Sequence, residues 1–172
     1  MKGFILGLIV GILLLPAAAF LYVWFGYAPV ATAAPPLPLE RTLTALALRA
    51  RIAKEAPKDS PVPPTEPNLL AGAKVYREYC AVCHGTAGEP KTATAKGMFP
   101  QPPPLLKDTG VTDDPVGETY WKAANGIRLT GMPAYGGSLS NEQLWQVSQV
   151  LANADKLPQS VKDLLAQPAP AH

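Results

Sequence analysis

Two cysteines and a histidine stand within five residues of this chain, in the stretch Cys80-Ala81-Val82-Cys83-His84. One helical turn brings residues three positions apart onto the same face, so both sulfurs can reach one planar ligand. This spacing is the one that attaches a haem through thioether bonds to its two vinyl groups. It predicts Cys80 and Cys83 as the attachment sites and His84 as an axial ligand of the iron.

Thiol–disulfide redox sites and zinc sites also use closely spaced cysteines. The chain has two cysteines and one further histidine, His172, which is too few for a four-ligand zinc site. A thioredoxin-like site needs strands that alternate with helices. Because the sequence has no run of alternating or β-branched residues, haem attachment is the stronger interpretation.

The composition of the 172 residues changes along the chain and predicts four segments. Residues 1–30 are almost wholly apolar and 31–67 are rich in Pro and Ala. Residues 68–167 are predicted to be a small folded domain, and 168–172 a flexible tail. From 68 to 167, nine Lys and Arg balance nine Asp and Glu, so no nucleic-acid partner is predicted.

The amino-terminal segment is predicted to cross a membrane. No charge occurs from Phe4 to Tyr27, and these 24 residues span roughly 36 Å as a helix. Lys2 precedes the segment and the next charge is Glu40, so the positive-inside rule places the amino terminus in the cytoplasm. We expect a single-pass protein of the cytoplasmic membrane, with its folded domain in the periplasm.

A cleaved signal peptide is the alternative, because small residues at 31–33 resemble a cleavage site. The uncharged run is too long for a typical signal sequence. Its end also carries aromatic residues typical of a membrane interface, namely Tyr22, Trp24, Phe25 and Tyr27. These features favour a retained anchor.

Between anchor and domain, prolines predict an extended spacer interrupted by a helix from Glu40 to Ala56. The helix has an apolar side, at Leu43, Leu46, Ala47 and Ala50, and several basic residues. It either lies on an anionic lipid surface or a partner subunit, or is a solvated spacer. Leu48 and Ile52 fall on a different face and weaken the amphipathic pattern.

The domain is predicted to be all-helical. Asn68 is a candidate N-cap for a helix that runs into the haem motif, and Gly72 would let another helix cross it closely. Asp114 as N-cap, with Pro115 in the first turn, and Asn125-Gly126 as a stop bracket a second helix. A capping box at Ser140-Asn141-Glu142-Gln143 opens a third helix, to about Asn153, which we expect to cross the first.

Two methionines are candidates for the second axial ligand. Met132 lies in Gly131-Met132-Pro133, where glycine and proline fix the backbone, and Met98 lies only fourteen positions after His84. The sulfur must reach the opposite face of the haem, which favours Met132 because an intervening helix can lead the chain around the ring. Core packing is the other role open to either methionine.

These features together resemble a membrane-anchored class I cytochrome c with one haem. The resemblance rests on Cys80-Ala81-Val82-Cys83-His84-Gly85, on residues 125–134 and on the helix that contains Leu144 and Trp145. It implies an all-α fold around one covalently bound haem c. It also implies His84 and Met132 as the iron ligands.

Several details around the haem remain open. The resemblance implies that a proline carbonyl orients His84, and Pro90, Pro100, Pro102, Pro103 and Pro104 are the candidates. Trp121 and Arg128 are candidate hydrogen-bond donors to the haem propionates. Apolar surroundings are expected from Phe99, Leu105, Ile127, Leu129 and Tyr135.

The expected function is electron transfer rather than catalysis. Two axial ligands leave no open position on the iron, so the chain is expected to carry single electrons between a membrane-bound donor and acceptor. The runner-up is a fixed haem-bearing subunit of a larger respiratory or photosynthetic complex. A haem sensor or peroxidase-like enzyme, in which the methionine dissociates, is less favoured, as is a purely structural membrane subunit.

Overall fold

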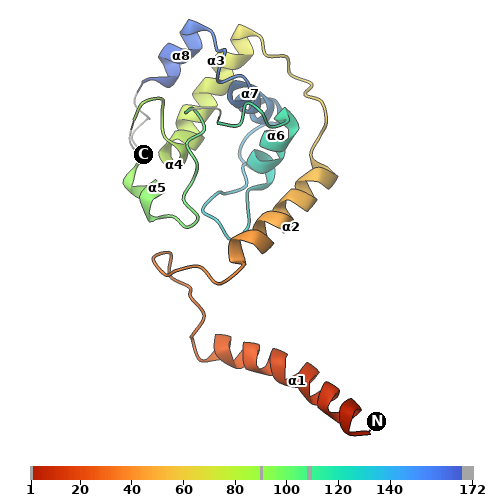
Figure 1. Cartoon of the computed structure of the whole chain (residues 1–172). Coiled ribbons are helices and arrows are strands. Elements are labelled where there is room, and N and C mark those ends of the chain that lie inside the picture. Colours follow the sequence, from red (N-terminus) through yellow and green to blue (C-terminus); the bar gives the residue numbers. More distant parts are fainter. Residues whose placement is uncertain (1, 90, 108–109, 168–172) are drawn as a thin grey trace. The chain divides into compact units, whose positions relative to one another are not determined.

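In the computed structural model, the part of the chain that is described, residues 2–89, 91–107 and 110–167, contains helices and no strand. This confirms the all-α class. The predicted tail at 168–172 and the candidate Pro90 lie outside the described residues. The helical segments are α1 (Lys2–Trp24), α2 (Glu40–Glu55), α3 (Glu66–Val75), the π-helical η1 (Tyr76–Cys80), α4 (Ala81–His84), α5 (Ala93–Gly97), α6 (Val116–Asn125), α7 (Asn141–Ala152) and α8 (Gln159–Leu165) (Figure 1).

The chain divides into two compact units, Met1–Arg41 and Thr42–His172. The first unit contains α1. Within α1, Gly3–Trp24 is long and apolar enough to cross a membrane, and among the described residues it is the single such helix. The large apolar side chains described on this helix are exposed, as expected of a helix whose apolar surface faces lipid.

In the second unit, α3, η1 and α4 follow one another without a break and carry the haem motif at their end. The predicted N-cap at Asn68 is wrong, because the N-cap is Thr65 and the helix begins at Glu66. Pro67 fits here because the first turn of a helix needs no backbone N–H donors. The Asn68 side chain instead donates to the Pro63 carbonyl at 3.0 Å.

Helices α3 and α7 cross at Gly72, as the sequence predicted. A Cβ atom at Gly72 would lie 2.2 Å from the backbone oxygen of Gln146. The two helices can therefore approach this closely only because residue 72 has no side chain. Tyr76, one turn further along, is fully buried beneath the crossing.

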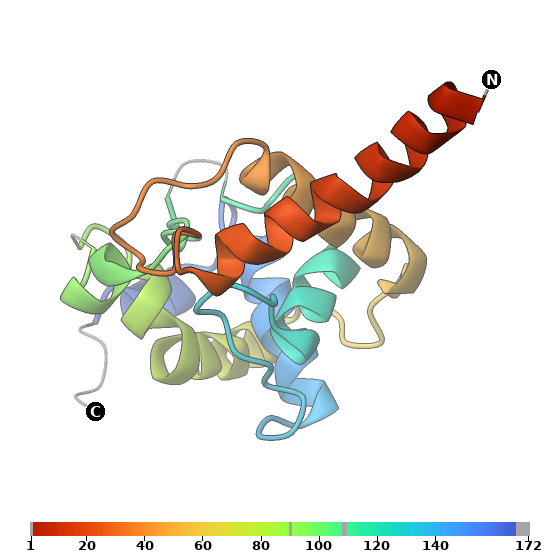
Figure 2. The ribbon, with the colours of Figure 1, turned by 90° about the horizontal axis from the view of Figure 1, so that it is seen from below.

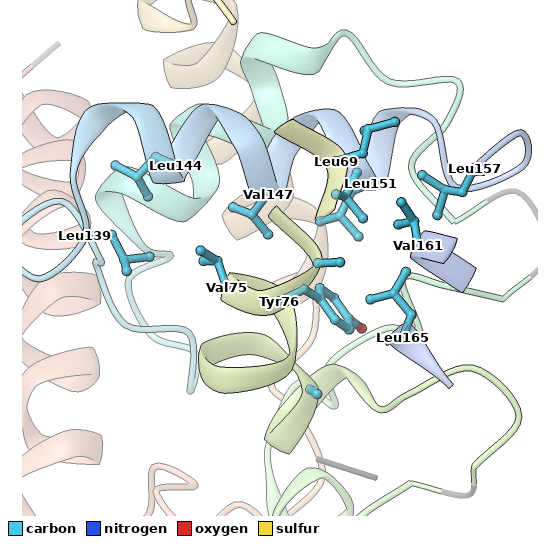
Figure 3. Close-up of a cluster of buried hydrophobic side chains, with 13 residues drawn as sticks. Leu69, Val75, Tyr76, Leu139, Leu144, Val147, Leu151, Leu157, Val161 and Leu165 are labelled. Carbon is cyan, nitrogen blue, oxygen red and sulfur yellow. The ribbon is translucent and has the colours of Figure 1, made fainter. Parts of the chain in front are cut away.

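A single apolar core joins α3, η1, α7 and α8 (Figure 3). Val147, Val150 and Leu151 of α7 pack there with residues from the other helices. The third helix predicted from the sequence corresponds to α7, and no helix was predicted after it. Val161 and Leu165 of α8 are nonetheless buried in this core, so the fold extends further than expected.

The ends of α6 and α7 follow local signals. Ser140 and Gln143 form both hydrogen bonds of the predicted capping box, and Gly126 ends α6 with a φ of +67°. The start of α6 differs from the prediction by one residue, because the N-cap is Pro115 rather than Asp114. Asp114 instead accepts a hydrogen bond from Lys122 Nζ at 3.1 Å.

Nearly all of helix α2 belongs to the second unit, where it packs beside α6 (Figures 1 and 2). Ile52 is 3% exposed, and Glu55 accepts a hydrogen bond from Trp121 Nε1 at 3.2 Å. A Cβ atom at Gly117 of α6 would collide with the carbonyl oxygen of Pro57 just after α2. The compact unit therefore begins well before residue 68, whereas the predicted boundary there was placed by composition alone.

Candidate functional site

A cavity of about 340 Å³ lies in the second unit, beside the end of the α3–η1–α4 helix. Four of the residues predicted from the sequence contribute to its wall. Cys80, Cys83 and His84 come from η1 and α4, whereas Met132 comes from the loop between α6 and α7. The fold thus brings together residues that are about fifty positions apart in the chain.

The two thiols are poorly suited to disulfide redox chemistry. Burial, with a smaller contribution from Cys83, raises the pKa of Cys80 to about 12. Burial also raises the pKa of Cys83. Redox-active thiols need the opposite shift. Among the described residues, no group of three or more His, Cys, Asp and Glu side chains is placed to hold a metal ion.

The ring of His84 is fixed by a carbonyl group. Its Nδ1 lies 2.8 Å from the carbonyl oxygen of Pro103, which can only accept, so Nδ1 carries the hydrogen. Burial lowers the pKa of His84, opposed by this hydrogen bond, and so favours the neutral ring. A neutral ring protonated at Nδ1 keeps Nε2 unprotonated, as a metal ligand requires. Among the candidate prolines, Pro103 therefore makes this contact.

The loop that carries Met132 is held from both sides. The Met132 backbone N–H donates to Thr130 Oγ1 at 3.1 Å, and its carbonyl accepts from the Ile127 N–H at 3.2 Å. The Tyr135 hydroxyl donates to the Tyr79 carbonyl at 2.9 Å, which ties this loop to the haem-motif helix. The position of Met132 relative to Cys80 and His84 is thereby fixed by hydrogen bonds.

Met98 also lines the cavity. Its sulfur lies close to Gly131, since a Cβ atom at Gly131 would come within 2.8 Å of it. Met98 thus packs against the residue that precedes Met132. Both methionines proposed as ligands therefore reach the same cavity. The Met98 backbone N–H donates to the Ala95 carbonyl at 3.4 Å, whereas the Met132 backbone forms two shorter hydrogen bonds.

Neither predicted propionate donor lies in the cavity wall. The Trp121 indole N–H is directed to Glu55 of α2, and Arg128 is exposed. Leu129 also differs from expectation: it is 80% exposed and has a φ of +62°. Phe99 is absent from the wall as well, whereas Leu105, Ile127 and Tyr135 line it as expected.

The wall also contains residues that were not predicted from the sequence, among them Thr119, Lys122 and Leu48. The Thr119 side chain is more than nine-tenths buried, and its hydroxyl has no hydrogen-bond partner among the described residues. Thr119 and Ala123 stand one turn apart on α6, a spacing that would have placed both on the cavity side. Leu48, which weakens the amphipathic pattern of α2 in the sequence, contributes to the cavity wall.

This cavity fits a haem. Its wall is predominantly apolar, from side chains such as Leu105, Val111, Ile127, Val147 and Leu151. Two thiols, an unprotonated imidazole nitrogen and two thioethers, those of Met98 and Met132, border this apolar space. The unpartnered Thr119 hydroxyl matches a ligand that is apolar over its faces and carries polar groups at its edge.

Comparison with known protein families gives an independent result. Residues 67–149 match the family described as cytochrome C oxidase, cbb3-type, subunit III. The match begins beside the start of α3 and ends within α7, so it includes the haem motif and Met132. The comparison with curated proteins finds no match.

Proposed function

This chain is a c-type cytochrome, and from that premise we propose that it carries single electrons between redox proteins while α1 holds it in a membrane. The observation that carries the proposal is the meeting of Cys80, Cys83, His84 and Met132 around one apolar cavity. Haem iron bound by histidine and methionine supplies a reversible one-electron couple. The roles of the chain's own residues follow from their positions.

Cys80 and Cys83 would hold the haem covalently through thioether bonds. His84 would bind the iron through Nε2, with its ring orientation set by the Pro103 carbonyl. Met132 would bind from the other axial side, with its backbone fixed by Thr130 and Ile127. With both axial positions taken, these residues leave no site where a substrate could bind the iron, so electron transfer is favoured over catalysis.

The apolar wall would also set the redox properties of the site. Thioether ligation favours ferrous iron, and exclusion of water from the cavity favours the less charged reduced state. Leu48 of α2 contributes to this exclusion, although it lies outside the region that matches the family. We therefore assign α2 a part in the site itself, in addition to its place in the linker.

Membrane attachment would keep the carrier near its partners. Fifteen residues separate Trp24, the end of α1, from Glu40, the start of α2, and they reach at most about 50 Å. We place the amino terminus in the cytoplasm and the haem domain in the periplasm, facing a membrane-bound donor and acceptor. Confinement to this distance raises the effective concentration of the domain at membrane partners.

A second candidate is a fixed subunit of a larger respiratory complex. The description of the matching family, a subunit of a cbb3-type oxidase, favours it. The packing of α2 on its own domain shortens the mobile part of the tether, which suits either function. Gentle solubilisation of the membrane separates the two, because a fixed subunit co-purifies in constant proportion with its partners and a mobile carrier does not.

The proposal is tested with the full-length protein in lipid vesicles. We expect it to take up and release one electron per chain in a redox titration, and to show the absorption band of a methionine sulfur bound to ferric iron. We expect no binding of carbon monoxide to the reduced protein. A high-spin spectrum with rapid carbon monoxide binding would instead indicate a sensor or a peroxidase-like enzyme.

A further inference from the structure

Helix α2 has two apolar faces, and the structure occupies only one of them. Ile52 and Leu48 face the rest of the second unit. Ile52 is 3% exposed, and Leu48 lines the cavity. Leu43 lies nine positions before Ile52, which places it about 180° around the helix. Leu43 and Leu46 are 60% and 65% exposed. The apolar residues of α2 thus form two stripes, one buried and one exposed, which explains their irregular spacing in the sequence.

The exposed stripe is the main apolar feature on the surface of the second unit. Among its described residues, the large apolar side chains that are exposed are Leu43, Leu46 and Leu129, and two of these three belong to α2. Ala47 and Ala50 are also exposed and extend the stripe along the same face. We call these four residues, Leu43, Leu46, Ala47 and Ala50, the outer face of α2.

Basic residues border this outer face. Arg49 and Arg51 lie on either side of it, about 120° and 80° around the helix from Leu43, and Lys54 lies at its end. From residue 42 to 58 the chain has four basic residues, Arg49, Arg51, Lys54 and Lys58, and one acidic residue, Glu55, a net charge of +3. By contrast, residues 68–167 have no net charge.

We propose that the outer face of α2 binds the surface of an anionic lipid bilayer, with its leucines among the acyl chains and its basic residues at the headgroups. An apolar stripe bordered by Arg and Lys is the pattern of an interfacial helix. Long basic side chains can reach the headgroups while their stems cover apolar surface. This inference rests on the part of the proposed function that places α1 in the membrane.

The tether gives the bilayer an advantage over other occupants. The fifteen residues between α1 and α2 keep α2 within about 50 Å of the membrane that α1 crosses. The net charge of +3 complements anionic headgroups. Ile52 and Leu48 lie on the opposite side of α2 and pack against the domain. Contact of the outer face with lipid would therefore also orient the cavity, with α2 between the bilayer and the haem.

The test places a spin label on this face in the full-length, haem-loaded protein, at one copy per lipid nanodisc. An Ala47→Cys substitution supplies the labelled thiol, because both native cysteines would be used by the haem. Lys162→Cys on α8, at the far side of the unit in Figure 1, supplies the reference position. The measurement compares collisions of the label with lipid-soluble oxygen and with a water-soluble nickel complex.

In phosphatidylglycerol-containing discs, we expect the label at 47 to gain oxygen collisions and lose nickel collisions, while the label at 162 stays in water. Leu43→Ser with Leu46→Ser should return position 47 to the values of position 162. Arg49→Gln with Lys54→Gln should lower the ratio of bound to unbound α2 on the order of thirtyfold, because each basic residue near an anionic surface contributes about 1 kcal/mol. The matched control, Lys156→Gln with Lys162→Gln, removes the same charge elsewhere and should change nothing.

Equal nickel access at 47 and 162 in anionic discs would overturn the proposal. So would protection of position 47 that requires a second copy or an added redox partner, since the outer face would then bind protein. The haem mass and spectrum are recorded on the same samples. Loss of lipid contact in a protein with intact haem would contradict this inference alone, whereas absence of haem would contradict the proposed function.

Discussion

The two methionines of the cavity differ in how the chain holds them. The Met132 backbone is hydrogen-bonded on both sides, to Thr130 and Ile127, in a loop tied to the haem-motif helix. Met98 has its sulfur against Gly131 and fills space beside that loop. A ligand to iron must be held at a fixed position, whereas a packing residue need only exclude water. This difference supports the proposal that Met132, rather than Met98, is the second axial ligand.

Met132→Ala should remove the sulfur-to-iron absorption band and lower the reduction potential, by tens to hundreds of millivolts within the roughly 0.8 V that axial ligands span. The vacant position should then bind carbon monoxide. The matched variant Met98→Ala should keep the band and shift the potential less. Both effects are read from a spectroscopic redox titration, and loss of the band in Met98→Ala instead would exchange the two assignments.

Thr119→Val tests the hydroxyl that has no partner among the described residues. If it donates to a carboxylate of the haem, the haem-loaded variant should lose about 1–3 kcal/mol of unfolding free energy in guanidinium, since Val cannot form that bond. Thr119→Ser keeps the hydroxyl and should retain most of the stability. A Val variant as stable as the parent would show that the hydroxyl serves no such contact.

The positions of residues in local motifs could be predicted from the sequence, whereas their roles stay proposals. Cys80, Cys83, His84 and Met132 all lie at the cavity, as their motifs indicated. Contacts set by distant segments could not be predicted. Five prolines were equivalent candidates until the fold brought Pro103 to His84, and the chemistry of Trp121 did not reveal that Glu55 would accept its hydrogen bond.

The close crossing of α3 and α7 at Gly72 was predicted from the sequence. Gly72→Ala would place a methyl group 2.2 Å from the Gln146 backbone oxygen. We expect a loss of unfolding free energy of about 1–3 kcal/mol or more, because backbone must move to make room. Gly97→Ala is the control, since a Cβ atom there meets nothing within 4 Å. Equal denaturation midpoints for both variants would contradict this packing.

Helix α2 should behave as part of the folded domain. Ile52→Ala should cost about 2–5 kcal/mol of unfolding free energy, as for other large-to-small changes of buried residues. Leu46→Ala on the exposed side of the same helix should be nearly neutral. Chemical denaturation of the haem-loaded protein measures both. If the Ile52→Ala and Leu46→Ala variants were equally stable, α2 would be a solvated spacer and not part of the folded domain.

Elements marked by local signals were predictable, and elements held by distant contacts were not. The capping box at Ser140 and the stop at Gly126 are written in adjacent residues. Helix α8 has no comparable start signal and is held by burial of Val161 and Leu165 in a core built by other helices. The residues of the two apolar faces of α2 alternate along the sequence. They can be told apart only in the structure, where one face is buried against the domain.

In the molecule as a whole, the domain that matches the cytochrome family extends back to α2 and is linked by a short segment to an apolar helix. The segment predicted as a long spacer is largely packed on the domain. The domain's range of movement is then set by the residues between α1 and α2, about 50 Å at most, rather than by the whole predicted linker. Under the proposed carrier function, partners beyond this distance would need to come to the domain.

The proposed function depends most on covalent attachment of one haem, and the mass of the mature full-length protein tests this attachment directly. We predict the polypeptide mass plus one haem, carried by the peptide that contains Cys80 and Cys83, and loss of that mass when both are changed to Ala. A mature chain whose two cysteines react as free thiols, with no added mass, would contradict the account.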